Sequence, residues 1–283
     1  MSRWLWLLLA ISIPSLALAQ DEELIALIRK TQAALKDQEL DAALDLAQKC
    51  VKLDGKSSAS HFILGEVYAA RRESKDAIEE YNRVLELEPT NVTALDHRGG
   101  EYFKQGKIED CITDFEKYLK ARPAAYPAHW RYGIACYYAG RFADGVKQFK
   151  AGEVEFGDDV ENIFWHYLCN ARIDGAEKAR EKMLKLEGIK QDTRIPMMDI
   201  LALIQDKSTP EKVLAAVTKA KLPANAEKEA LFYANLYIGL NYEALGNAAK
   251  AKEHLEAADK LQISHYMWDV GHTDLLLRKM KTK

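Results

Sequence analysis

The feature that most constrains the fold of this chain is a repeat with a period of 34 residues. Glycine, small, aromatic and chain-breaking residues each recur at this spacing. The series are Gly65, Gly99 and Gly133; Ala43, Ala77, Cys111 and Gly145; Tyr81, Phe115 and Phe149; Tyr68, Tyr102 and Cys136; and Gly55, Pro89, Pro123 and Gly157. Because five independent series share one period, we expect repeated structural units rather than one or two ordinary globular domains.

Each unit is predicted to form two antiparallel helices. In the second unit these helices span Ser58–Arg71 and Ser74–Leu87. A glycine inside a helix, such as Gly65, costs ~1 kcal/mol relative to alanine. We expect the compensation to be a close approach of Ala77 from the partner helix, with Tyr68 and Tyr81 filling the space around that contact. Pro89 ends the second helix, since the residue before a proline is disfavoured in the helical conformation.

A helix pair of this length with these residues resembles the tetratricopeptide repeat family. The resemblance implies an all-α fold, a right-handed superhelical solenoid of antiparallel helix pairs with a C-terminal capping helix. It rests mainly on residues 58–157 and 229–261, with degenerate repeats at 24–57 and 161–186. The whole arrangement, including Gly133–Arg141, is similar to that of NlpI-type exported bacterial adaptor proteins, which implies an adaptor role by analogy.

The predicted organisation has four parts. They are a signal peptide at 1–19, a repeat array at 20–187, an irregular helical insertion at 188–226, and a last repeat with its capping helix at 227–283. Within the insertion, Asp192–Gln205 indicates a short helix. Ser208–Glu211 predicts the start of a helix that runs to about Ala220, with a hydroxyl cap and a proline in the first turn. The capping helix is predicted over His265–Met280.

The N-terminal residues have the three-part pattern of a secretory signal peptide. A basic residue, Arg3, precedes an apolar stretch from Trp4 to Ile13, and small residues follow up to Ala19. We expect cleavage after Ala19. The apolar stretch is shorter than the ~20 residues of a membrane-spanning helix, and the first cysteine, Cys50, lies too late for a lipoprotein signal. The protein is therefore expected to be periplasmic or secreted, without a membrane span after cleavage.

Composition and motifs argue against catalysis and nucleic-acid binding. The formal net charge is -3, which gives no basic field for nucleic acid. The sequence has no nucleophile elbow, P-loop, dinucleotide fingerprint or recognised zinc spacing. We therefore predict a non-enzymatic protein with no cofactor and no metal. One alternative stays open at this stage, a metal-dependent hydrolase that uses His265, Asp269 and His272.

All four cysteines occupy positions of the repeat that are expected to be buried. Cys50, Cys111, Cys136 and Cys169 are interpreted as small packing residues, because free cysteine behaves as a hydrophobe in such places. The alternative is a disulfide between Cys111 and Cys136, which an exported compartment would permit.

The predicted functional feature is an aromatic concave groove. Family resemblance assigns the groove to first-helix positions and their neighbours, namely Phe62, Glu66, Asp96, His97, Phe103, Trp130, Arg131, Tyr137 and Tyr138. Aromatic residues and arginine dominate protein interfaces. The groove therefore predicts docking of a peptide or partner helix from another protein of the cell envelope or secreted space, with Trp130, Tyr137 and Tyr138 as a binding patch.

Three other interpretations of these features remain. The same aromatic residues would suit an envelope glycan, peptidoglycan or another polysaccharide, as stacking platforms. Alternatively, at least half of them pack in the core. The weakly patterned terminal repeats would also allow a homodimer.

Overall fold

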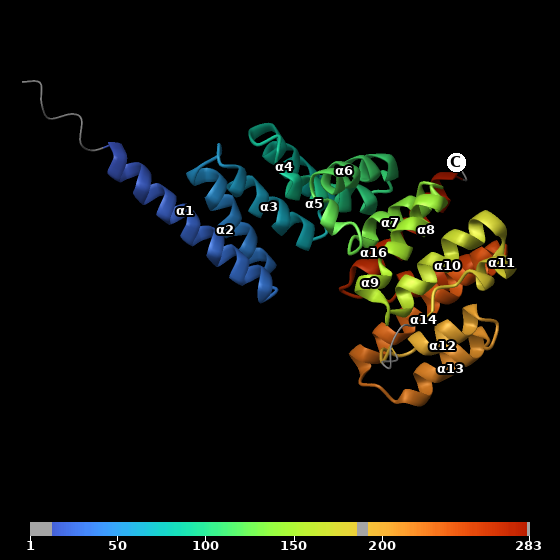
Figure 1. Cartoon of the computed structure of the whole chain (residues 1–283). Coiled ribbons are helices and arrows are strands. Elements are labelled where there is room, and N and C mark those ends of the chain that lie inside the picture. The colour runs from blue at the N-terminus through green and yellow to red at the C-terminus, as the bar shows by residue number, and fades with distance from the viewer. Residues whose placement is uncertain (1–12, 186–191, 282–283) are drawn as a thin grey trace, which may run out of the picture. The chain divides into compact units, whose positions relative to one another are not determined.

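The computed structural model describes residues 13–185 and 192–281. Within these residues it contains sixteen α-helices, one short 3-10 helix and no strand. Consecutive helices pack against each other as pairs along most of the chain (Figure 1). The predicted all-α fold of helix pairs is therefore confirmed.

The chain divides into two compact units, the first ending at Glu101. The helices of the first unit are α1 (Ile13–Lys36), α2 (Leu40–Leu53), α3 (Ser58–Ala70), α4 (Ser74–Leu87) and most of α5 (Val92–Lys104). Helix α1 pairs with α2, and α3 pairs with α4, while α2 contacts α3. The predicted bounds of the second repeat are thus confirmed, with α4 matching at both ends. The core of this unit lies between α1, α2 and α3 and includes Ala47, Cys50 and Val67.

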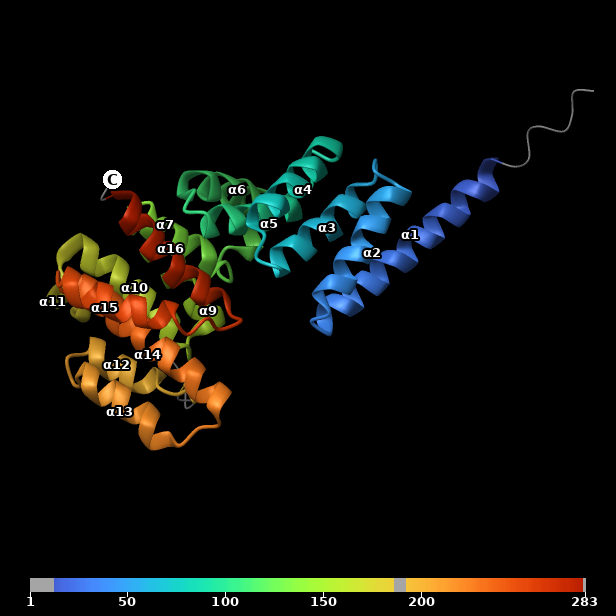
Figure 2. The same cartoon turned by 180° about the vertical axis from the view of Figure 1, so that it is seen from behind.

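The second unit, from Tyr102 onward, contains the other helices and one continuous core that runs from Phe103 to Leu275. Its helices are α6 (Ile108–Ala121), η1 (Pro123–Ala125), α7 (Trp130–Tyr138), α8 (Phe142–Ala151), α9 (Glu153–Phe156), α10 (Val160–Asp174), α11 (Ala176–Glu181), α12 (Met197–Ile204), α13 (Pro210–Ala220), α14 (Ala224–Ala244), α15 (Ala248–Asp259) and α16 (Tyr266–Lys281). Helix α14 pairs with α15, and α12 and α13 pack beside α14 (Figure 2).

Local sequence explains several helix ends. Thr209 caps α13 through a side-chain bond from the Lys212 amide, and Pro210 occupies the first turn, as predicted. The turns between paired helices carry Gly106 and Gly140, whose φ angles of +71° and +74° favour glycine. The predicted insertion contains α12 and α13, but residues 186–191 lie outside the described part of the chain.

Two of the repeat glycines, Gly65 and Gly133, lie against an aromatic ring of the partner helix. A Cβ atom on Gly65 would lie 2.7 Å from Cε1 of Tyr81. A Cβ atom on Gly133 would likewise lie 2.6 Å from Cζ of Phe149. Tyr81 therefore fills the space beside Gly65, as expected, and in the last repeat the backbone of Ala251 also lies close to Gly239, with its carbonyl oxygen 3.1 Å from a Cβ atom built on that glycine.

The N-terminal prediction lies partly outside the described residues, since residues 1–12 are not described. Helix α1 begins at Ile13 and continues through the predicted cleavage site after Ala19. Gln20 donates a side-chain hydrogen bond to the Leu53 carbonyl at 2.8 Å, and Leu24 and Thr31 are buried. Among the described residues, no helix is both long and apolar enough to cross a membrane.

The four cysteines all lie in the described part of the chain. Each is buried and each is free, so the structure contains packing thiols and no bond between Cys111 and Cys136. Burial raises the pKa of Cys136 to about 12, which keeps this thiol protonated and unreactive near neutral pH.

Candidate functional site

The predicted groove residues fall into both units. In the first unit, Phe62 and Glu66 lie on α3 and Asp96 and His97 lie on α5. The structure brings Phe62 and His97 together, with their ring centroids 5.0 Å apart. All four side chains are half-buried, and burial raises the pKa of Glu66. The predicted groove residues of the first unit therefore lie on α3 and α5 and are aromatic or acidic, apart from His97.

In the second unit, the predicted residues are less accessible than a surface patch requires. Phe103 is fully buried and Tyr137 is 3% exposed. The ring of Tyr137 packs against Trp165 and Phe142 at centroid distances of 5.6 and 5.7 Å. The hydroxyl group of Tyr138 is also buried. Trp130, Tyr137 and Tyr138 all lie on α7, but in this structure they do not form one exposed patch.

The chain's own C-terminal helix, α16, covers this aromatic face. Tyr266 places its ring 6.0 Å from Phe103 and 5.3 Å from Trp130, and the Arg131 guanidinium lies 6.0 Å from the same ring. Thr273 Oγ1 donates to the Phe103 carbonyl at 3.3 Å. Both cartoon views show α16 beside α7 (Figures 1 and 2). Helix α16 therefore lies against Phe103 and Trp130, two of the predicted groove residues.

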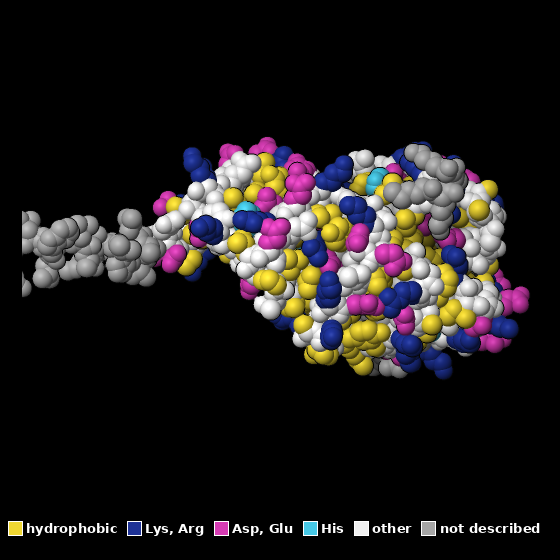
Figure 3. All heavy atoms as spheres, turned by 90° about the horizontal axis from the view of Figure 1, so that it is seen from above, with side chains coloured by type: hydrophobic (Ala, Val, Ile, Leu, Met, Phe, Trp, Pro, Cys, Tyr) yellow, Lys and Arg dark blue, Asp and Glu magenta, His cyan; other side chains and the backbone are white. Residues whose placement is uncertain are grey.

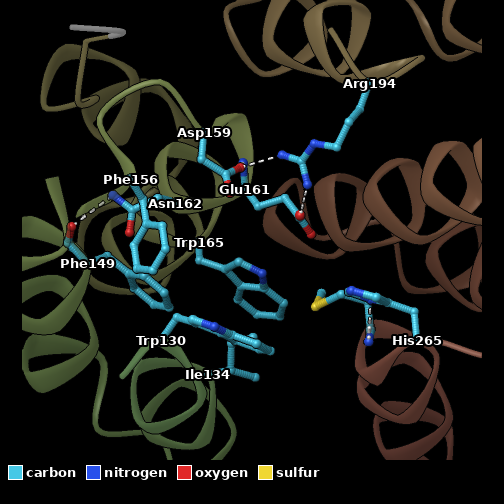
Figure 4. A pocket seen from close by; sticks show the side chains of 11 residues that line it. Trp130, Ile134, Phe149, Phe156, Asp159, Glu161, Asn162, Trp165, Arg194 and His265 are labelled. Atoms are coloured by element: carbon cyan, nitrogen blue, oxygen red, sulfur yellow. Dashed lines mark hydrogen bonds and ion pairs between the residues drawn. The ribbon is translucent and has the colours of Figure 1, made fainter. Parts of the chain in front are cut away.

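A cavity of about 230 Å³ lies next to Trp130 (Figure 4). Helices α7, α8 and α10 supply most of its wall, and α9, the start of α16 and the segments before α10, α12 and α16 supply the remainder. The lining side chains are Trp130, Ile134, Phe149, Phe156, Asp159, Glu161, Asn162, Trp165, Arg194, His265 and Met267. We call this space the Trp130 cavity.

One wall of the Trp130 cavity is an ion-pair cluster. The Arg194 guanidinium bridges Asp159 and Glu161, and its Nη2 atom is 2.6 Å from Oδ1 of Asp159. Arg194 also pairs with Asp192 at 2.6 Å. The Tyr237 hydroxyl donates to Glu161, whose pKa is raised by burial. The carboxylates therefore hold a fixed arrangement on this wall.

Two buried polar atoms at the cavity have no hydrogen-bond partner among the described residues. They are Nε1 of Trp165, a donor, and Oδ1 of Asn162, an acceptor. The other half of the Asn162 amide donates to the Phe149 carbonyl at 3.0 Å. Buried polar groups are normally paired in folded proteins. An unpaired donor and an unpaired acceptor beside one cavity therefore indicate room for a ligand that carries both.

The proposed histidine cluster is not assembled. Nδ1 of His265 lies 3.1 Å from the Tyr233 hydroxyl, whereas Nδ1 of His272 lies 2.8 Å from Oδ1 of Asp259. The part of the chain that the structure describes contains no group of three His, Cys, Asp or Glu side chains suited to a metal ion. His265, Asp269 and His272 therefore do not form the site that the hydrolase interpretation needs.

Sequence reasoning missed most of the Trp130 cavity. Trp130 was among the predicted groove residues, whereas Trp165, Glu161 and Arg194 were not. One signal was available, because Asp159, Glu161, Asn162 and Trp165 follow one another closely at the start of one helix. Arg194 had only its neighbour Asp192 as a local signal, since its cavity partners Glu161 and Asp159 lie more than thirty positions earlier.

Comparison with known proteins supports the repeat assignment. Residues 29–92 and 98–159 match the tetratricopeptide repeat family. Tetratricopeptide repeat protein 14 of Mus musculus is 31% identical over 103 residues, which is 36% of this chain and only 11% of that protein.

Solved structures support the fold. A tetratricopeptide repeat protein from Parabacteroides merdae ATCC 43184 aligns with a TM-score of 0.58 and 14% identity, over 89% of this chain and 99% of that one. MamA from Desulfovibrio magneticus RS-1, residues 41 to the end, aligns with a TM-score of 0.52 and 17% identity, over 56% of this chain and 89% of that one. At such identities the likeness concerns the fold alone.

Proposed function

We propose, from the match of residues 29–92 and 98–159 to the tetratricopeptide repeat family, that the protein is a non-enzymatic scaffold that docks a peptide or helix of a partner protein. Helix pairs that stack in this way create extended faces suited to binding other chains. Recognition would follow the helix-in-groove mode, in which an amphipathic helix places its apolar side against a row of hydrophobic residues.

The observation that carries the proposal is the position of α16. In the second unit, this helix rests on Phe103 and Trp130, two of the predicted groove residues. The contact supports the idea that such faces accept a helix. In the first unit, the predicted positions include Phe62 and His97, which are half-buried. We place the partner-binding face on α3 and α5 of the first unit.

Surface charge suggests a mainly apolar contact. On the face of the molecule shown in Figure 3, basic and acidic side chains are interspersed with hydrophobic ones over the described residues. Such mixing provides no single-sign field to attract a strongly charged polymer. Glu66 lies beside Phe62 on the same helix, so a helix with an apolar face and a basic flank fits best.

The test compares two variants of the purified protein. Glu66→Lys reverses the charge on the proposed face, and Glu79→Lys makes the same change at an exposed position of α4. Partners captured from the native organism by the wild-type protein should bind Glu66→Lys at least ten-fold more weakly and Glu79→Lys normally. Circular dichroism checks that both variants fold. Equal binding of both variants to every captured partner would contradict the proposed face.

We also propose that the protein acts outside the cytoplasm. The support is the pattern from Arg3 to Ala19 together with the contacts of α1, because Gln20, Leu24 and Thr31 all follow the proposed cleavage site. A processed chain would keep those contacts. Edman sequencing of the protein from cell fractions should give a periplasmic or secreted form that begins at Gln20. An intact N-terminus in the cytoplasmic fraction would refute export.

In that compartment, the scaffold would act as an adaptor that brings envelope proteins together, the role implied by the resemblance to NlpI-type proteins. A homodimer would double the number of docking faces. Light scattering on the purified chain measures this directly, since a dimer has twice the mass of the 32.0 kDa chain or of its processed form.

A further inference from the structure

We propose that the Trp130 cavity binds one neutral sugar ring, a pyranose unit carried by a glycan. This inference goes beyond protein docking and does not depend on it. All of the lining residues belong to the second unit, whereas the proposed docking face belongs to the first.

The size of the cavity selects a single ring. A dry cavity of about 150 Å³ holds a benzene molecule, and pockets for drug-sized ligands start at about 300 Å³. The Trp130 cavity, at about 230 Å³, lies between these values. It therefore suits one six-membered ring with small substituents and excludes a long apolar chain.

The aromatic walls select a ligand with a flat apolar face. Figure 4 shows the rings of Trp130, Phe149, Phe156 and Trp165 around the same space. Phe149 and Trp165 are nearly parallel, with 18° between their planes, which holds the indole in place. A pyranose presents a face of C–H groups that packs against aromatic rings, while its hydroxyl groups project around the edge.

The two unpaired polar atoms at the cavity favour a ligand with hydroxyl groups. Trp165 is 2% exposed, and the nitrogen edge of its indole is turned toward the side of the cavity where Glu161 and Arg194 lie (Figure 4). Nε1 needs an acceptor, whereas Oδ1 of Asn162 needs a donor. A hydroxyl group supplies both functions. A guanidinium or ammonium group has no lone pair for Nε1, and a carboxylate group has no proton for Oδ1, whereas the hydroxyl groups of a neutral polyol satisfy both atoms.

The charged side chains on the wall of the cavity already form ion pairs with one another. Arg194 holds Asp159 and Glu161, and Tyr237 donates to Glu161. These carboxylates are therefore fixed as hydrogen-bond acceptors at the rim instead of free charges that would capture a cationic side chain. Fixed carboxylate and guanidinium groups offer further acceptors and donors to ring hydroxyls.

The test is a binding titration of the full chain by calorimetry. The probes are glucose, galactose, mannose and N-acetylglucosamine, with β-linked oligomers of glucose and of N-acetylglucosamine, and N-acetylarginine amide as a cationic probe. We expect saturable binding of at least one sugar or its oligomer and none of the arginine derivative. Binding of the oligomer alone would place the recognised ring within a chain, and binding of the monomer would identify a single ring as sufficient.

A matched pair of variants separates the site from the fold. Trp165→Phe keeps an aromatic ring but removes the unpaired N–H, and it should weaken sugar binding at least ten-fold. Trp268→Phe removes an indole N–H that already donates to the Asp259 carbonyl at 2.9 Å outside the cavity, and it should leave binding unchanged. The proposal is overturned if no sugar binds, if the arginine derivative binds more tightly than every sugar, or if Trp165→Phe binds like the wild type.

Discussion

Gly65 and Gly133 tolerate little change, because a ring of the second helix occupies the space where their side chains would be. Gly65 therefore does more than loosen a helix. It sets the distance between α3 and α4 by admitting Tyr81, which is fully buried. The same arrangement with Phe149 at Gly133 explains why glycine and aromatic residues keep the same period along the chain.

The first prediction concerns whether replacing Gly65 raises or lowers the free energy of unfolding. Gly65→Ala should lower the free energy of unfolding, because overpacking against Tyr81 costs about 1–3 kcal/mol, against a helix-propensity gain of about 1 kcal/mol. In the background of Tyr81→Ala, the same change should stabilise the protein. Urea unfolding of the four proteins in this double-mutant cycle measures both effects. If Gly65→Ala also destabilised the Tyr81→Ala variant, the Tyr81 ring would not be the cause of the destabilisation.

The second prediction concerns His166, whose pKa is lowered by burial to about 4. Folding keeps this imidazole neutral while the unfolded chain accepts a proton below about pH 6.5. Stability from this residue is therefore present above pH 6.5 and is lost as the pH falls, by about 2 kcal/mol at pH 5. His166→Gln should show a shallower loss between pH 7 and 5. Urea unfolding at several pH values measures this, and parallel curves for both proteins would contradict it.

For single residues, the sequence predicted the position of a residue along its helix better than the side chains that it contacts. The period showed where Gly65, Ala77 and Tyr81 lie along their helices, but not how closely the Tyr81 ring approaches the glycine. That depends on side-chain length across the helix pair. Likewise, burial of the cysteines followed from their register, whereas the unpaired nitrogen of Trp165 depends on neighbours from other helices.

At the scale of elements, helix ends with local signals were predictable. Helix α4 has the predicted bounds, and α13 begins at the predicted Pro210 because capping acts over a few residues. The position of α16 was not predictable in this way. Its contacts with Phe103 and Trp130 involve residues more than a hundred positions away, and no repeat period relates them.

The third prediction concerns the contact between α16 and α7. Tyr266→Ala removes the ring that lies against Phe103 and Trp130, and should lower the free energy of unfolding by about 2–4 kcal/mol. Water would also reach Trp130, so its fluorescence should shift to longer wavelength. Leu245→Ala, at an exposed residue of the same unit, is the control and should change neither quantity. Unaltered stability in Tyr266→Ala would mean that α16 is only loosely held.

At the scale of the whole molecule, the two units have separate cores. Leu64 belongs to the core of the first unit, and the core of the second runs from Phe103 to Leu275. In arrays of repeats, each unit depends mainly on its immediate neighbours. Sequence periodicity was sufficient to predict the array, but it did not predict the boundary between the two units, which falls within α5.

The fourth prediction follows from these separate cores. Leu64→Ala should cost about 2–5 kcal/mol within the first unit. Hydrogen exchange followed by mass spectrometry should show faster exchange in α2, α3 and α4, with unchanged rates in α10, α14 and α15. Faster exchange throughout the chain would indicate a single cooperative unit instead.

The hydrogen bond from Thr273 to the Phe103 carbonyl links α16 to α5, and this has a consequence for folding during synthesis. A ribosome releases α5 and α7 long before α16, and domains tend to fold as they emerge, N-terminal parts first. Until the last helix arrives, Phe103, Trp130 and Tyr138 would lack their cover. A nascent or truncated chain would thus display an aromatic row that the finished protein hides, and cellular quality control could distinguish incomplete molecules from complete ones by that row.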